Sequence, residues 1–303
     1  MPGTRELKRR IKSVKNIMQV TMALEAVSVS RVRRATSQTL ASRAYADLAM
    51  QMLSNIASAN QSGTALHPLL AKPKQEVGTV TLLLITSDRG LAGAYNSNIM
   101  RVGRRFQQHI GKPVRWVALG RKGRDMLLRT KENLIAEFTG VPAALHIQYV
   151  RPIARILMDD YLKGQTDEVY IAYTDFINTL TQQPRIQRLL PLVPGEAGKL
   201  GGQQYMKVQP ASAVKIPDYI YEPSAEGILN EIVPKFTELV IFQSLLESVA
   251  SEHSARMVAM RNASDNAKSL SESYTLSYNK ARQALITNEI LDIVGGVEAL
   301  KNT

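Results

Sequence analysis

Apolar residues recur at helical spacing over very long stretches at both ends of the chain. From Thr4 to Ser62, and again from Lys235 to Val294, the sequence contains neither glycine nor proline, the two residues that most often interrupt helices. Each run would form a helix about 90 Å long if unbroken, at 1.5 Å per residue. Because average globular helices are several times shorter, we expect neither run to belong to a compact ball.

The apolar positions in both runs have the spacing of a coiled coil. In the second run, steps of four and three residues from Leu239 pass through many small and polar residues, including His253, which we expect to be partly buried. Such a pattern predicts that the two ends pair antiparallel within one chain, although two broken helices in a bundle would also satisfy it. In the first run the same steps connect Leu7, Ile11, Val14, Met18 and Thr21, beside a second stripe of Ile17, Val20, Leu24 and Val27.

The middle of the chain alternates between strand and helix patterns. The alternation predicts a small parallel sheet with right-handed crossovers, and hence an α/β fold class flanked by two long helices. We expect domains at 1–62, 75–215 and 218–303, with a flexible glycine-rich loop at 194–210. The predicted strands are 79–87, 114–119 and 168–176, and the predicted helices are 97–110, 124–131 and 153–162.

Charge and composition exclude some classes of protein and indicate the kind of partner. The chain has no cysteine, which excludes disulfides and thiolate chemistry, and no apolar run long enough to span a bilayer. The net charge of +12 is concentrated in residues 1–45, whereas residues 225–300 are acidic, so we expect an acidic partner: nucleic acid, anionic lipid or a protein surface. No leader-like segment precedes the first helix, from which we expect a bacterial protein on the cytoplasmic side.

The most tempting site for chemistry is the loop that follows the first strand, Asp88-Arg89-Gly90-Leu91-Ala92-Gly93. Neither this loop nor Gly120-Arg121-Lys122-Gly123 has the glycine spacing of a dinucleotide or triphosphate loop. We therefore expect a tight turn in which Asp88 and Arg89 pair or cap a helix. The four histidines are scattered without metal-ligand spacing. We expect no catalytic residue, cofactor or metal.

The residues alone leave three interpretations of the function open. One is a coiled-coil scaffold, one a nucleotide-binding Rossmann-type protein with helical arms, and one a basic coiled coil that binds nucleic acid. Against the last, the bases of the first helix are interleaved with Leu7, Ile11 and Val14 rather than preceding the apolar repeat. We therefore expect a charged outer face on a coiled-coil helix, and no nucleic-acid partner.

Five segments together resemble the γ subunits of bacterial F-type ATP synthases. These segments are 5–35, 85–99 (ITSDRGLAGAYNSNI), 176–192, 250–270 and 278–296. The resemblance implies an antiparallel coiled coil and a small Rossmann-like domain, without an active site. It implies a central rotor shaft that couples rotation of the c-ring to ATP synthesis or hydrolysis on the β subunits. The implied partners are the α and β subunits, the ε subunit and the c-ring, in a complex peripheral to the cytoplasmic face of the bacterial inner membrane.

The resemblance also assigns roles to single residues. Tyr221 and Glu222 would lie at the foot, near the c-ring or ε, and Asp88, Arg89, Gly90 and Gly93 form a structural family motif. Met22 stands where many relatives have Lys, and Leu24 where many have Met. The residues expected to contact β are Arg9, Arg10, Lys12, Met22, Leu24, Arg31, Arg33, Arg34, Arg256, Arg282, Gln283 and Thr287.

Overall fold

The computed structural model describes residues 3–59, 67–70, 77–142, 144–192 and 225–301. It divides into two compact units. Unit 1 comprises residues 1–28 and 257–303, and unit 2 comprises residues 29–256. The two long helices, α1 (Thr4–Ala59) and α5 (Ala225–Lys301), each contribute to both units. The predicted domain boundaries at 1–62, 75–215 and 218–303 remain a prediction.

Unit 1 is an antiparallel pair formed by the start of α1 and the end of α5. Thr21 Oγ1 and Ser264 Oγ share a hydrogen bond of 2.7 Å, and the guanidinium of Arg10 lies 5.9 Å from the ring centroid of Tyr274. Moving forward along α1 thus means moving backward along α5, as the predicted coiled coil requires. The buried positions of α5 in this unit are Met260, Ser264, Ala267 and Ser271, which keep the predicted steps of four and three.

The second apolar stripe of α1 does not join this seam. Leu7 and Thr21 are buried, whereas Ile17, Val20 and Val27 are 53%, 59% and 49% exposed. A helix that buries one stripe against a single partner helix leaves its neighbouring stripe in solvent. The outward stripe is therefore available to another molecule.

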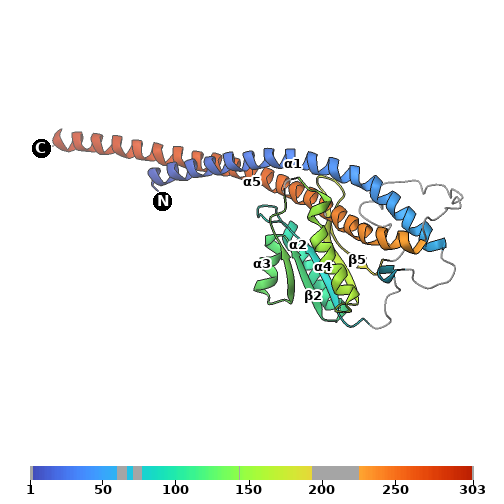
Figure 1. Ribbon diagram of the computed structural model, residues 1–303. Coiled ribbons are helices and arrows are strands. Elements are labelled where there is room, and N and C mark those ends of the chain that lie inside the picture. Colours follow the sequence, from blue (N-terminus) through green and yellow to red (C-terminus); the bar gives the residue numbers. More distant parts are fainter. Residues whose placement is uncertain (1–2, 60–66, 71–76, 143, 193–224, 302–303) are drawn as a thin grey trace. The chain divides into compact units, whose positions relative to one another are not determined.

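Unit 2 is built around one mixed five-stranded sheet in the order β3-β2-β1-β4-β5 (Figure 1). The predicted parallel strands are present as β1 (Val80–Ile85), β2 (Val114–Leu119) and β4 (Glu168–Phe176). Two strands were not predicted: β3 (Leu134–Phe138), parallel to β2, and β5 (Gln182–Leu190), antiparallel to β4. The sheet is therefore larger than expected and not wholly parallel.

Helices cover both faces of the sheet, because the central strands are apolar on both sides. Leu82, Leu84 and Trp116 face α2 (Tyr95–Ile110) and α3 (Arg121–Arg129). Leu83 and Val117 face α4 (Arg151–Leu162) and the first part of α5. Two short 3₁₀ helices, Pro68–Leu70 and Ile147–Tyr149, complete the second layer.

The first part of α5 is tied to the sheet by hydrogen bonds as well as by apolar contacts. Ser251 Oγ donates to the carbonyl of Thr174, and the amide of Thr174 donates to Ser248 Oγ. α5 also begins earlier than its glycine- and proline-free run, and it continues through Pro234 without ending. Burial of its apolar face against the sheet offsets the hydrogen bond that Pro234 cannot donate.

Candidate partner-binding surface

The end of α5 is an isolated helix with apolar side chains left in solvent. Every residue from 282 to 295 is exposed. Successive positions turn by 100°, so these apolar side chains spread over about two thirds of the circumference of the helix. We call residues 284–297 the apolar tip; its exposed large apolar residues are Leu285, Ile286, Ile290, Leu291, Ile293, Val294 and Val297, each 46–67% exposed.

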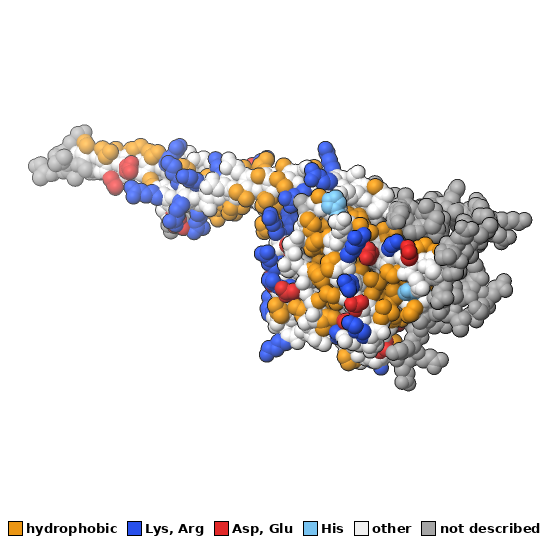
Figure 2. Space-filling view, viewed as in Figure 1, with side chains coloured by type: hydrophobic (Ala, Val, Ile, Leu, Met, Phe, Trp, Pro, Cys, Tyr) orange, Lys and Arg blue, Asp and Glu red, His pale blue; other side chains and the backbone are white. Residues whose placement is uncertain are grey.

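Such a segment indicates a partner. A helix that is apolar on all sides is normally buried, and a contiguous exposed apolar patch marks an interaction surface. Figure 2 shows apolar side chains along this end of α5, and Lys and Arg side chains around the start of α1. Within unit 1, the exposed large apolar side chains of α5 gather at its end, whereas exposed bases lie on both α1 and the preceding part of α5.

The predicted contact residues of unit 1 lie on its outer surface. Arg9, Arg10, Lys12 and Met22 are exposed, and Leu24 is half-buried. Arg10 differs from its neighbours because its guanidinium is paired with Glu6 at the i−4 position. Hydrogen bonding to Glu6 raises the pKa of Arg10 above its already high ordinary value.

On α5, Arg282, Gln283 and Thr287 are exposed where the apolar tip begins. The Thr287 hydroxyl donates to the carbonyl of Gln283 at 3.0 Å, so within the described chain it is satisfied by its own helix. The side chains of Arg282 and Gln283 remain available for a partner. In unit 2, Arg31, Arg33 and Arg34 are exposed on α1.

Arg256 has a different setting from the other predicted contacts. Only 9% of the residue is exposed, and its guanidinium donates to the carbonyl of Gly90 through Nε at 3.3 Å and Nη2 at 3.2 Å. Nη2 also pairs with Glu252 Oε1 at 2.7 Å. The side chain therefore fastens the loop 88–93 to α5, which leaves little of it for a partner to contact.

Two ionisable neighbours of Arg256 are strongly perturbed. Burial raises the pKa of Glu252, and the charge of Arg256 acts against that rise. Burial, helped by the charges of Arg256 and Arg31, lowers the pKa of His253 to about 4. A neutral His253 can accept a hydrogen bond from Arg256 at Nδ1, 3.2 Å away. Sequence reasoning missed Glu252, although its i−4 spacing from Arg256 was a usable signal.

The Asp88 side chain joins the loop 88–93 to the segments that follow β2 and β3. The Asp88 carboxylate accepts hydrogen bonds from the amide of Arg121, at the start of α3, and from the amide of Val141. This is where a helix start would otherwise attract an anion. Asp88 thus caps a helix, as predicted, and the residue beside it, Arg89, contributes its carbonyl to Ser87 Oγ.

The glycines of the 120–123 segment have a packing role. A Cβ on Gly120, whose φ is +101°, would lie 2.2 Å from the carbonyl oxygen of Thr86, and a Cβ on Gly123 would lie 2.7 Å from Thr86 Oγ1. Gly93 also has a positive φ, of 55°. These glycines allow close approach of α3 to β1 and a sharp turn. They do not form a phosphate cradle.

The remaining predictions concern the foot residues, metal sites and membrane-spanning helices. Tyr221, Glu222 and the loop 194–210 lie outside the described residues. Among the residues that are described, no group of three or more His, Asp or Glu side chains is placed to hold a metal ion. Within the same ranges, no helix combines the length and hydropathy needed to cross a bilayer.

Comparison with known proteins identifies the family. The family model "ATP synthase" matches residues 3–300. A protein named "ATP synthase gamma chain" from Herpetosiphon aurantiacus is 45% identical over 99% of both chains, and one of that name from Dehalococcoides mccartyi strain 195 is 42% identical over 99% of this chain and all of that one.

Solved structures agree with this assignment. A chain in the central stalk and c-ring structure of the Tetrahymena thermophila mitochondrial ATP synthase matches with a TM-score of 0.58 and 25% identity, over 81% of this chain and 99% of that one. A chain in an OSCP/F1/c-ring structure of the Euglena gracilis mitochondrial ATP synthase has the same fold, with a TM-score of 0.66 at 19% identity, over 98% and 94%. The chain therefore belongs to the family of ATP synthase gamma chains.

Proposed function

We propose that this chain is the central rotor shaft of a bacterial F-type ATP synthase. It turns with the c-ring and transmits that rotation to the subunits that make or hydrolyse ATP. The observation that carries the proposal is the apolar tip, a helix end with large apolar side chains exposed over about two thirds of its circumference. A sleeve formed by other subunits would cover it, and an apolar surface without fixed hydrogen bonds lets the contact change during rotation.

The tip has few groups that could hold it in one orientation. Leu291 and Ile293 are 61% and 67% exposed, and the charged residues among 284–295 are two acids, Glu289 and Asp292. The nearest bases that precede these residues on α5 are Lys280 and Arg282, and further bases lie at the start of α1. We infer that apolar contact surrounds the tip while the arginines meet acidic parts of the β subunits.

The finer assignments follow from the same proposal. ATP chemistry takes place on the β subunits, and γ contributes a changing contact. Arg9, Lys12, Arg282 and Gln283 contact β directly, together with Arg10, Met22, Leu24, Thr287 and the unit 2 arginines Arg31, Arg33 and Arg34. Arg256 acts from inside unit 2, by holding the loop 88–93. Tyr221 and Glu222 contact the c-ring or ε, and the complex lies on the cytoplasmic face of the inner membrane.

The first experiment is a pull-down of the tagged chain from lysate of its source bacterium. The α and β subunits should co-purify, and recovery of neither would refute the proposal. A deletion of residues 288–303 should still assemble but should couple ATP hydrolysis to ion transport poorly. The substitution Arg155→Gln serves as a control, because Arg155 is an exposed residue of α4 far along the chain from the tip. It should assemble and couple normally.

A second assay separates the catalytic assignment from assembly. The purified γ chain should hydrolyse no ATP, whereas the complex that it assembles should do so. Hydrolysis by the isolated chain, at a rate that survives further purification, would contradict the placement of catalysis on β. Fractionation of cells with an antibody to γ should find the chain in the membrane fraction and release it when the complex is stripped from the membrane.

A further inference from the structure

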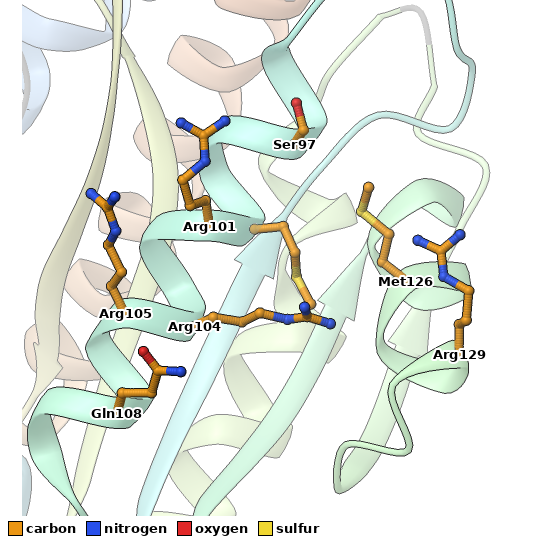
Figure 3. A pocket seen from close by; sticks show the side chains of 8 residues that line it. Ser97, Arg101, Arg104, Arg105, Gln108, Met126 and Arg129 are labelled. Carbon is orange, nitrogen blue, oxygen red and sulfur yellow. The ribbon is translucent and has the colours of Figure 1, made fainter.

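A pocket of about 410 Å³ opens between α2 and α3 in unit 2, on the face of the sheet opposite α4 (Figure 3). Four of the residues that line it are arginines: Arg101, Arg104 and Arg105 from α2, and Arg129 from α3. All of its lining residues belong to the described chain, and none of them is a carboxylate. The pocket is therefore strongly positive without a neutralising group in its wall.

The helix that carries three of these arginines is rigidly seated. Ile99 is fully buried against the sheet, and Gly103 approaches Trp116 so closely that a Cβ there would lie 3.1 Å from its ring. Arg101, Arg104 and Arg105 are spaced i, i+3 and i+4, so they share the side of α2 turned away from this contact. Figure 3 shows Arg104 extending from α2 towards α3, where Arg129 stands.

One donor in this group lacks an acceptor. Nε of Arg104 is shielded from solvent and has no hydrogen-bond partner among the described residues. Arg101 has only an uncharged partner in the described chain, since its Nη2 donates to Asn98 Oδ1 at 3.1 Å. A shielded, unsatisfied donor on a charged group is unfavourable, and a turn of the Arg104 side chain that brings Nε to an anion in the pocket would relieve it.

A solvated basic face is the simplest alternative, since surface arginines usually need no partner. Here, however, the four arginines are among the residues that line a concavity, and one of their donors is withheld from water. Arginine forks bind phosphate oxygens in pairs, and the pocket volume is within the range of small-molecule sites. Met100 and Met126 add a polarisable apolar wall against which a ring could pack.

We propose that this pocket binds a polyphosphate group, either free or as the phosphate chain of a nucleotide. The site is separate from the loop 88–93, where Asp88 occupies the helix start. It also goes beyond the shaft function and does not depend on it. A ligand here would give the rotor subunit its own site for a soluble polyanion.

Calorimetric titration of tripolyphosphate into the full chain tests the proposal. The native chain should show saturable binding at one site. Arg104→Gln should weaken it at least tenfold, and Arg104→Lys, which keeps the charge but loses the fork, should fall between the two. Arg155→Gln removes the same charge from α4 on the opposite face and should change affinity by less than about twofold. Far-UV circular dichroism should confirm that each variant is folded.

The outcomes separate the possible sources and the two proposals. Tighter binding of ATP than of tripolyphosphate would indicate a nucleotide, and equal binding would indicate free polyphosphate. A titration without saturable heat would overturn the site. An equal loss of affinity in Arg155→Gln would overturn it too, as would binding of polyglutamate in place of tripolyphosphate. A chain that assembles with α and β but fails this titration would disprove only the site. A chain that binds but does not assemble would disprove only the shaft.

Discussion

Replacing Arg256 by leucine should destabilise unit 2 severely, because it breaks a buried ion pair from one side. The substitution removes the 2.7 Å contact to Glu252 and the hydrogen bonds to the carbonyl of Gly90. Glu252 would then be left buried without the charge that opposes the rise of its pKa. Removing one partner of a buried pair typically costs about 3–5 kcal/mol. Because Glu252 can take up a proton, we expect the lower end, about 3 kcal/mol.

The companion variants isolate the cause. Arg256→Leu combined with Glu252→Leu removes both charges, so it should be at least about 1 kcal/mol more stable than Arg256→Leu alone. Arg155→Leu makes the same chemical change at an exposed site and should shift stability by no more than about 0.5 kcal/mol. Leucine is chosen because it keeps much of the apolar stem of arginine in place.

Unfolding in urea, followed by tryptophan fluorescence, gives the free energies. Trp116 is the single tryptophan of the chain and is fully buried in β2, so its emission reports on unit 2. A loss of unfolding free energy below about 1 kcal/mol in Arg256→Leu would refute the reasoning, because removing one partner of a buried ion pair costs more than that. A double variant as unstable as the single one would show that Glu252 is not the source of the loss.

Three further predictions follow from other contacts. Gly120→Ala should destabilise unit 2 by more than about 3 kcal/mol in the same urea assay, because its Cβ would lie 2.2 Å from the Thr86 carbonyl oxygen; a loss under 1 kcal/mol would contradict this. The pKa of His253 is lowered to about 4, so the folded chain should lose up to about 3 kcal/mol as pH falls from 6.5 to 4, and His253→Gln should flatten that part of the stability profile. Ile290→Asn with Leu291→Asn should leave unfolding within about 0.5 kcal/mol, because both side chains are exposed, yet reduce coupled ion transport by the assembled complex; normal coupling would count against the tip.

The coiled-coil seam was predictable because its pattern is local and long. Steps of four and three residues identified Leu7 and Thr21 on α1, and Ser264 and Ala267 on α5, and all four are buried. A repeat sustained over many turns outweighs the polar character of single positions. The same reasoning could not show that the second stripe, beginning at Ile17, would face outward, because that depends on how many helices pack together.

The two unpredicted strands have weak patterns for a physical reason. β3 (Leu134–Phe138) is short and only half-buried, and β5 (Gln182–Leu190) is rich in polar residues and contains Pro184. Both lie at edges of the sheet, where each pairs with one neighbour only. An edge strand tolerates proline and exposed polar side chains, so the pattern that indicates a central strand is missing.

The backbone partner of Arg256 could not be predicted from local spacing. Its acceptor is the backbone carbonyl of Gly90, far away in sequence, and a carbonyl carries no sequence signature. The family resemblance suggested either a contact with β or a part in the stability of the shaft for Arg256, and the burial of its side chain favours the second. Glu252 was within reach of a helical argument, yet its spacing alone describes an exposed pair as well as a buried one.

The loop 88–93 shows how an α/β unit can keep the frame of a nucleotide-binding fold without its ligand site. In such folds the start of a helix beside a strand end attracts phosphate, because its amide groups are unpaired. Here Asp88 supplies the anion from within the chain, by accepting from the Arg121 amide at the start of α3. Glycine at 120 and 123 then serves packing, with both positions pressed against Thr86. With the start of α3 capped in this way, the loop presents its carbonyls to Arg256, and the strand end that binds a cofactor in other proteins becomes the attachment point for a shaft helix.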